Sequence, residues 1–104
     1  MDDHQRKMWP AMIGQIGEYR AGRLGLGALT AGLRGLYVEA DPHDAVVRDQ
    51  FEAVLASIDM QYELRIEPWA PAGSASDEAL DRALDAFTEG VAAILARDRA
   101  AEHR

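Results

Sequence analysis

The sequence predicts an all-α protein, a small four-helix bundle, and three observations lead to that prediction. Apolar residues recur at steps of three and four in four separate stretches, which is the spacing of one face of an α-helix. Residue types that favour helix ends stand at the borders of these stretches. The chain has 104 residues and no cysteine, a length that buries roughly two-thirds of the unfolded chain's surface without disulfides. We therefore expect residues 1–104 to form one helical domain.

The first stretch predicts a helix over about residues 6–21. Its apolar face consists of Trp9, Met12, Ile13, Ile16 and Tyr19. Gly22 follows at the position where a left-handed residue commonly ends a helix. Because proline fits best in the first turn of a helix, Pro10 predicts that the ordered part begins close to Trp9.

The second stretch predicts a helix over about residues 26–39. Its apolar face consists of Leu26, Leu29, Leu33, Leu36 and Tyr37. Glycines at positions 25, 27, 32 and 35 each lower helix propensity by up to about 1 kcal/mol relative to alanine. We interpret Gly32 as a point where a neighbouring helix approaches closely.

The third stretch predicts a helix over about residues 42–66. Asp41 offers a carboxylate cap, Pro42 suits the first helical position, and Asp44 adds an acid in the first turn. The apolar face consists of Val47, Phe51, Val54, Leu55, Ile58, Tyr62 and Ile66. We expect Phe51 to point into the core.

The last part of this stretch is ambiguous, because residues 61–66 also alternate as a half-buried strand does. A strand needs a partner, and the one candidate, residues 36–39, would leave a two-stranded ribbon that is marginal in water. We therefore expect residues 61–66 to be helical, with a strand as the alternative.

The fourth stretch predicts a helix over about residues 77–97, after a loop over 68–75 that begins with Pro68. Ser76 offers a hydroxyl cap, and two acids follow it near the positive end of the helix dipole. The apolar face consists of Leu80, Leu84, Phe87, Val91, Ile94 and Leu95. We expect Phe87 to point into the core and the charged tail 98–104 to fray.

The charge and hydropathy of the sequence argue against two classes of function, nucleic-acid binding and a role in a membrane. The net charge is −7, from 18 acidic residues against 11 Lys and Arg, which argues against direct binding of nucleic acid. Residues 39–63 hold seven acids against Arg48 alone, a net charge of −6. No apolar run approaches the ~20 residues that cross a bilayer, and acids follow Met1 where a leader would be basic and then apolar. We expect a cytoplasmic protein without a membrane role.

The sequence offers little for catalysis or metal binding. There is no cysteine and no nucleophile elbow, and the serines lie at positions 57, 74 and 76. The run Gly25-Leu26-Gly27 lacks the third glycine of a dinucleotide site and the lysine of a P-loop. The histidines, at positions 4, 43 and 103, do not have the spacing of a helical metal site. We expect neither enzyme activity nor a cofactor or metal.

One group of polar residues stands out along the third helix. Glu52, Asp59, Glu63 and Glu67 follow one another at steps of seven, four and four, which places them in one exposed row beside the buried face. The row is either a solvated surface or a binding surface for a basic partner. General acid and base catalysis is the weaker interpretation, because exposed carboxylates lack the burial that shifts a pKa. Replacing Asp59 or Glu63 by lysine is expected to leave stability nearly unchanged.

A wider pattern resembles a known family. Its residues are Ile16, Tyr19, Gly22, Leu24, Leu26, Leu29, Leu33, Leu36, Asp41, Phe51, Ile58, Asp59 and Glu63. Over about residues 9–66 this arrangement looks like the small all-helical immunity proteins that bacteria keep beside colicin-type and contact-dependent-inhibition toxins. In one departure, inhibitors of DNase colicins have paired tyrosines on their binding helix, whereas Glu63 follows Tyr62 here. The resemblance implies a compact, acidic protein that binds a nuclease toxin and blocks its basic surface.

Two functions follow from these features. The first is an immunity-like protein that neutralises a basic, nuclease-type toxin through the acidic row of the third helix. Its expected binding residues are Glu52, Asp59, Tyr62, Glu63, Glu67 and Trp69, with the two aromatic residues as apolar anchors. The alternative is a small helical adaptor, or a homodimeric structural protein that buries Trp9 and the glycine-rich face of residues 26–39, with no toxin partner.

Overall fold

The computed structural model describes residues 1–102, and these residues form four helices with no strand. The helices are α1 (Asp3–Arg20), α2 (Leu26–Ala40), α3 (Ala45–Ile66) and α4 (Asp77–Glu102). The prediction of an all-α fold is confirmed. Residues 61–66 belong to α3, so the alternative of a strand there is wrong.

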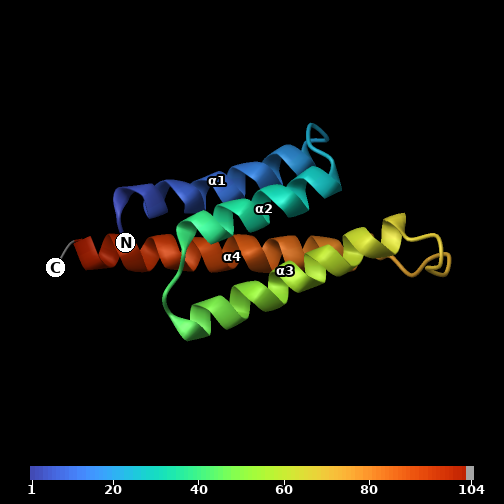
Figure 1. Cartoon of the computed structure of the whole chain (residues 1–104). Helices are drawn as coiled ribbons and strands as arrows, with labels where there is room; N and C mark the ends of the chain where they lie inside the picture. The colour runs from blue at the N-terminus through green and yellow to red at the C-terminus, as the bar shows by residue number, and fades with distance from the viewer. Residues whose placement is uncertain (103–104) are drawn as a thin grey trace.

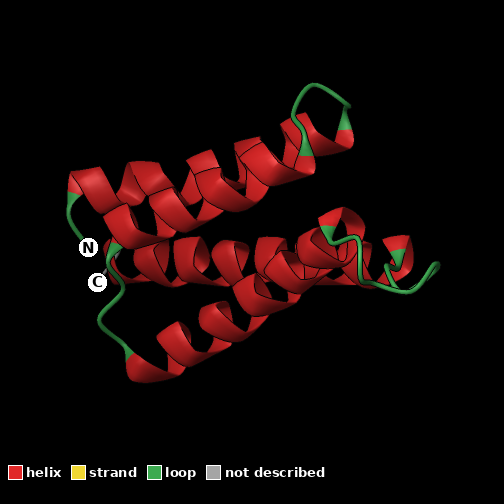
Figure 2. Cartoon of the chain, turned by 45° about the vertical axis from the view of Figure 1, so that its right-hand side comes forward, coloured by secondary structure: helices red, strands yellow, loops and turns green. Residues whose placement is uncertain are grey.

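The four helices form an antiparallel bundle in which helices that are consecutive in the chain lie side by side (Figure 1). α1 packs against α2 and α4, and α3 packs against the same two helices, while the backbones of the diagonal pairs stay more than 8 Å apart between Cα atoms. This is the arrangement of a four-helix bundle with short connections. The hairpin of α3 and α4 extends past the connection between α1 and α2, as both views show (Figures 1 and 2).

Phe51 of α3 lies at the centre of the core, where its ring packs against one aromatic ring from each of the other three helices. Its ring centroid lies 5.2 Å from that of Trp9, 5.9 Å from that of Tyr37 and 5.1 Å from that of Phe87. These distances are typical of stabilising aromatic pairs. Phe51 and Phe87 are both buried, as the sequence predicts.

Close packing between helices depends on glycines that receive a neighbour's side chain. A Cβ atom on Gly90 of α4 would lie 3.0 Å from Cζ of Phe51, and one on Gly27 of α2 would lie 2.9 Å from Oη of Tyr62. At Gly32 the neighbour is Oε1 of Gln15, at 2.8 Å from the same built position. The close approach expected at Gly32 is present, and it comes from a side chain of α1.

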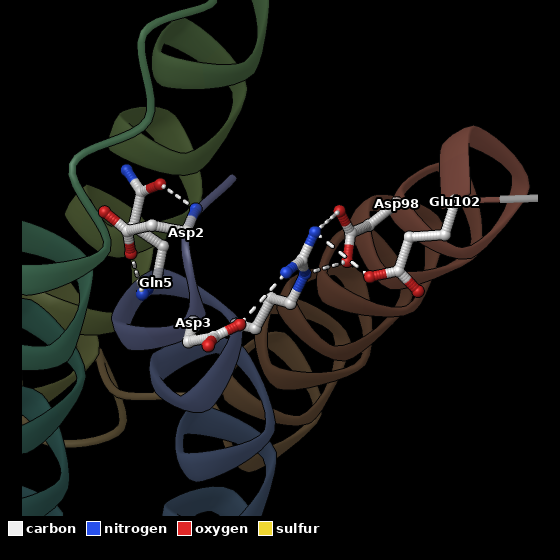
Figure 3. A network of polar contacts seen from close by, with 6 residues as sticks. Asp2, Asp3, Gln5, Asp98 and Glu102 are labelled. Carbon is white, nitrogen blue, oxygen red and sulfur yellow. Dashed lines mark hydrogen bonds and ion pairs between the residues drawn. The ribbon is translucent and has the colours of Figure 1, made fainter.

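The beginning of α1 differs from the sequence prediction, because the helix starts at Asp3 and includes Pro10 in its interior. Asp2 and Gln5 form a reciprocal capping box: the N–H of Gln5 donates to Oδ1 of Asp2 at 2.8 Å, and the N–H of Asp2 donates to Oε1 of Gln5 at 3.0 Å (Figure 3). This cap stabilises a first turn two turns before the proline. Pro10 is exposed, and its cost to the helix is offset by the packing of the buried Trp9 next to it.

The end of α1 agrees with the prediction at Gly22, which has φ +79°. The N–H of Gly22 donates to the carbonyl of Tyr19 at 3.0 Å, and the N–H of Arg23 donates to the carbonyl of Glu18 at 2.9 Å. This pair of hydrogen bonds is the Schellman motif, which needs a left-handed residue at the glycine position.

The predicted cap of the third helix is wrong by three residues. Asp41 ends α2 in a left-handed conformation, with φ 44° and ψ 60°, and Asp44 caps α3, which begins at Ala45. Oδ1 of Asp44 accepts hydrogen bonds from the N–H groups of Val46 at 2.9 Å and Val47 at 3.2 Å. The residue before a proline avoids the right-handed helical region, so Pro42 makes Asp41 a terminating residue and leaves the capping position to the next aspartate.

The cap of α4 is confirmed, but its predicted end is wrong. The N–H of Ala79 donates to Oγ of Ser76 at 3.1 Å. At the other end, residues 98–102 are helical and do not fray, because Arg6 of α1 binds Asp98 at 2.8 Å and Glu102 at 3.0 Å (Figure 3). Positions 103 and 104 of the predicted tail lie outside the described residues. Within residues 1–102, none of the helices combines the length and hydropathy that crossing a membrane requires.

Candidate functional site

The acidic row along α3 is divided by a side chain of α2. The guanidinium of Arg34 lies between Glu52 and Asp59, with Nη2 2.6 Å from Oδ2 of Asp59 and Nη1 3.7 Å from Oε2 of Glu52. The hydrogen bond with Asp59 raises the pKa of Arg34 above its usual value, against the opposing effect of burial. These two carboxylates therefore serve an ion pair between helices. The acidic row that the sequence predicts therefore has one half, Glu52 and Asp59, that lies beside a cation of α2.

The other half of the row lies beyond the reach of Arg34. Glu63 is exposed on the last turns of α3, and Glu67 is half-buried at the first position after the helix. Neither carboxylate forms an ion pair with any residue in 1–102.

Tyr62 does not have the free position expected of an anchor. Its ring lies against Gly27 of α2, and the side chain is half-buried. A residue that fills the space over a glycine in a neighbouring helix stabilises the bundle first. The sequence contains both residues but no signal that pairs them.

Trp69 is the exposed aromatic residue next to this end of α3, with 71% of its surface accessible. It lies on the connection between α3 and α4, close in sequence to Ile66, which is also exposed. We call Glu63, Ile66, Glu67 and Trp69 the α3–α4 tip. This tip belongs to the end of the α3–α4 hairpin that extends past the α1–α2 connection (Figures 1 and 2).

Hydrogen bonds hold the connection that presents Trp69. Oε1 of Gln61 accepts from the N–H of Ser76 at 2.8 Å, and Arg65 binds Asp77 at 2.7 Å, so the last turns of α3 are tied to the start of α4. Within the connection, Oγ of Ser74 donates to the carbonyl of Pro71 at 2.7 Å. An aromatic side chain on an ordered segment loses less conformational entropy on binding than one on a free loop.

Most other acids in the chain already have an internal role. Within residues 1–102, all but four of the acidic side chains either cap a helix or lie within 4 Å of a basic group. The four exceptions are Asp49, Glu63, Glu67 and Glu89. Two of these exceptions therefore lie in the α3–α4 tip, within six residues of the exposed Trp69.

Some of the ion pairs that occupy the remaining acids join residues far apart in the sequence. Arg6 is surrounded by Asp3, Asp98 and Glu102 (Figure 3), and Arg20 binds both Asp81 and Asp85, at 3.1 and 2.8 Å. The pair of Arg6 with Asp3 lies within α1, but the other four pairs join α1 to α4, and sequence patterns along one helix cannot show them.

The tip combines an exposed indole and an exposed aliphatic side chain with the exposed Glu63 and the half-buried Glu67. Among residues 1–102 no group of three or more His, Cys, Asp or Glu side chains could hold a metal ion. Comparisons with protein-family models, with curated proteins and with solved structures give no match for this chain.

Proposed function

We propose that this chain is a protein-binding module that docks its α3–α4 tip on a basic surface of another protein. The observation that supports the proposal is an indole that is 71% exposed and close in sequence to two carboxylates that form no ion pair within residues 1–102. The immunity-like inhibitor of a nuclease-type toxin is the form of this function that the sequence resemblance implies.

The two kinds of side chain in the tip have different roles in such a complex. Tryptophan is among the residues whose truncation most often costs 2 kcal/mol or more of binding energy at an interface, a rough general figure. Glu63 and Glu67 attract a basic partner over distances of about one Debye length, roughly 8 Å at physiological salt, and so increase the association rate. Trp69 is therefore the expected anchor, and the carboxylates are the expected steering charges.

The homodimer alternative required Trp9 at the interface between two copies, and this fold buries Trp9 within one copy. Trp9 is 2% exposed and contacts Phe51, so a second copy has no access to it. Pairing two copies through the α3–α4 tip would bring like charges together, because each copy presents Glu63 and Glu67 without a cation. An adaptor function through another surface stays as the competing proposal.

The test compares the binding of three variants with that of wild type. Two of them each remove two acidic charges, and the third removes the indole of Trp69. The partner is co-purified from the native host, identified, and titrated with wild type, Trp69→Ala, the double variant Glu63→Gln/Glu67→Gln, and the control Asp49→Asn/Glu89→Gln. The control removes the same amount of charge from acids that also lack an ion-pair partner but lie outside the tip.

We expect Trp69→Ala to weaken binding at least tenfold, and Glu63→Gln/Glu67→Gln to slow association and reduce its dependence on salt. The control is expected to bind as wild type does. Equal binding by all three variants, or a second copy as the main partner, would remove the proposed surface. A partner that lacks toxic activity would leave the surface in place and remove the inhibitor function.

A further inference from the structure

α3 and α4 each carry a row of residues that lies outside the core and repeats at alternating steps of three and four. The row on α3 contains no charged residue and consists of Val46, Gln50, Ala53, Ser57, Met60 and Leu64. The row on α4 consists of Ala79, Arg82, Ala86, Glu89 and Ala93. We call the two rows together the outer face. Their spacing is that of the contact positions in paired helices.

The outer face is open to solvent within one copy of the chain. All of its members are exposed except Leu64 and Ala79, which are half-buried. Val46 and Met60 are large apolar residues that are 65% and 53% exposed. A groove between α3 and α4 joins the rows, and its lining includes Ser57, Met60, Ala79, Arg82 and Ala86. Covering this apolar surface with a second surface removes it from water, which is favourable.

The two rows have a common centre along the bundle. The register follows from Phe51, whose ring lies 3.0 Å from a Cβ atom built on Gly90. Because α3 and α4 are antiparallel and have the same rise per residue, Leu55, one turn after Phe51, is level with Ala86, one turn before Gly90. Leu55 is halfway along the row of residues 46–64, and Ala86 is the middle member of the row on α4.

The charges on the α4 row are complementary about this centre. Arg82 lies four residues before Ala86, and Glu89 lies three residues after it. Within residues 1–102, Glu89 forms no ion pair, and Arg82 forms one long pair, with Glu78 at 3.6 Å. If two copies of α4 lie antiparallel with their centres together, Arg82 of each copy is opposite to Glu89 of the other.

We propose that a second copy of this chain packs on the outer face in the antiparallel direction, about a twofold axis level with Leu55 and Ala86. A twofold interface uses the same patch on both copies, so the patch has to be complementary to itself. The α4 row meets this condition with opposite charges, and with alanines that lie opposite to alanines. The α3 row meets it with Val46 of each copy opposite to Leu64 of the other.

The size of the outer face indicates a weak dimer. The row on α3 spans about 27 Å at about 1.5 Å per residue, and two helices of about 10 Å width give roughly 500 to 600 Å² per copy. Stable complexes bury about 800 Å² per partner. The rows end at Leu64, before the exposed Trp69, so the pairing does not use the α3–α4 tip. Either proposal can therefore fail without the other.

The experiment is sedimentation equilibrium of the full chain up to 1 mM, with charge reversals at the outer face. We expect Arg82→Glu and Glu89→Arg each to raise the dimer dissociation constant at least tenfold, because like charges then face each other twice. An equimolar mixture of the two variants is expected to recover dimers within about threefold of wild type, because every acid then faces a cation. The control Arg48→Glu makes the same charge change on an exposed residue outside the two rows and should dimerise as wild type does.

Cysteine cross-linking tests the antiparallel register, since the chain has no cysteine of its own. Ala86→Cys lies next to the proposed axis, so an oxidant such as copper–phenanthroline should link two copies of this variant. Ala92→Cys, at an exposed position of α4 outside the row, should stay unlinked under the same conditions. A mixture of Ala79→Cys and Ala93→Cys should cross-link faster than either variant alone.

The proposal is overturned if wild type is monomeric at 1 mM, or if the two charge reversals dimerise as wild type does with unchanged thermal melts. It is also overturned if the mixture of the two reversals stays monomeric, or if Ala86→Cys links no faster than Ala92→Cys. A chain that pairs through this face and has no other partner in the native host would support this inference and remove the proposed function.

Discussion

The part of α3 that α2 covers and the part that extends past α2 use the same kinds of residue in different ways. In the covered part, Glu52 and Asp59 bind Arg34. In the extended part, Glu63 and Glu67 lie on the same row and form no ion pair with a residue of the described range 1–102. What differs between the two parts is the neighbouring helix. The function of an acid on a helix surface is therefore decided by the residue that a second helix places opposite to it.

The aromatic residues show the same difference. Phe51 is buried among Trp9, Tyr37 and Phe87, and Tyr62 lies over Gly27 at the start of α2. A few residues further on, Trp69 is 71% exposed. The aromatic residues of the covered part pack in the bundle, and the extended part carries the surface that we propose for a partner.

The largest effect is expected from removing a core ring. Phe87→Ala should lower the free energy of unfolding by roughly 3–5 kcal/mol, because the ring is fully buried and its loss leaves a cavity. Phe51→Ala should have an effect of similar size. Urea titration followed by circular dichroism measures both, with Trp69→Ala as the control from the extended part. A loss under about 1 kcal/mol in both variants would show that these rings do not form the core.

The periodicity of apolar residues was enough to predict the four helices and the inward position of Phe87. The errors at the helix ends have a common cause: local rules compete, and contacts with distant residues decide between them. Pro10 lies inside α1 because the capping box of Asp2 and the packing of Trp9 stabilise the helical turns that precede it. Residues 98–102 stay helical because Arg6, more than ninety residues away in the sequence, binds them.

The candidate site was predicted less well for the same reason. The spacing placed Glu52, Asp59 and Glu63 in one row, and this depends only on the helix. Which of them is neutralised depends on the position of Arg34 on α2, and the rotation of α2 against α3 cannot be obtained from either helix alone. Trp69 could be predicted as a binding residue from the sequence, because it follows Pro68 in a predicted loop and does not belong to the apolar face of any helix.

The second prediction concerns the ion pair that divides the row. Arg34→Gln should lower the free energy of unfolding by about 1 kcal/mol, since the Arg34 side chain is 42% exposed and solvent screens the pair. Arg48→Gln, on an exposed arginine of α3 without an ion pair among the described residues, should change stability less. A double-mutant cycle of Arg34→Gln with Asp59→Asn measures the coupling directly. A coupling of zero would mean that Asp59 is as free as Glu63.

The third prediction concerns Asp98 of α4, an acid that forms an ion pair with Arg6. The hydrogen bond from Arg6 lowers the pKa of Asp98 below its usual value. A carboxyl group with a lowered pKa in the folded state adds stability above its unfolded pKa of about 3.9, and this stability is lost as the pH falls through the folded value. Asp98→Asn should therefore flatten the acid side of the stability profile, measured by urea titration between pH 2 and 6. An unchanged profile would show that the pair with Arg6 does not form in solution.

The smallest effect on stability is expected at the exposed acid of the α3–α4 tip. Glu63→Lys should change the free energy of unfolding by no more than about 0.5 kcal/mol, because the side chain is exposed and has no ion-pair partner among the described residues. Asp59→Lys, one turn earlier on the same row, removes the 2.6 Å contact with Arg34 and places two cations side by side, so it should cost about 1 kcal/mol. The sequence alone predicts equal effects for the two variants, and the structure predicts unequal ones. Thermal and urea melts of both variants at low and high salt distinguish these outcomes, because the extra loss in Asp59→Lys should shrink as salt screens the repulsion. Equal melts would place Asp59 among the free acids and return the whole row to the candidate binding surface.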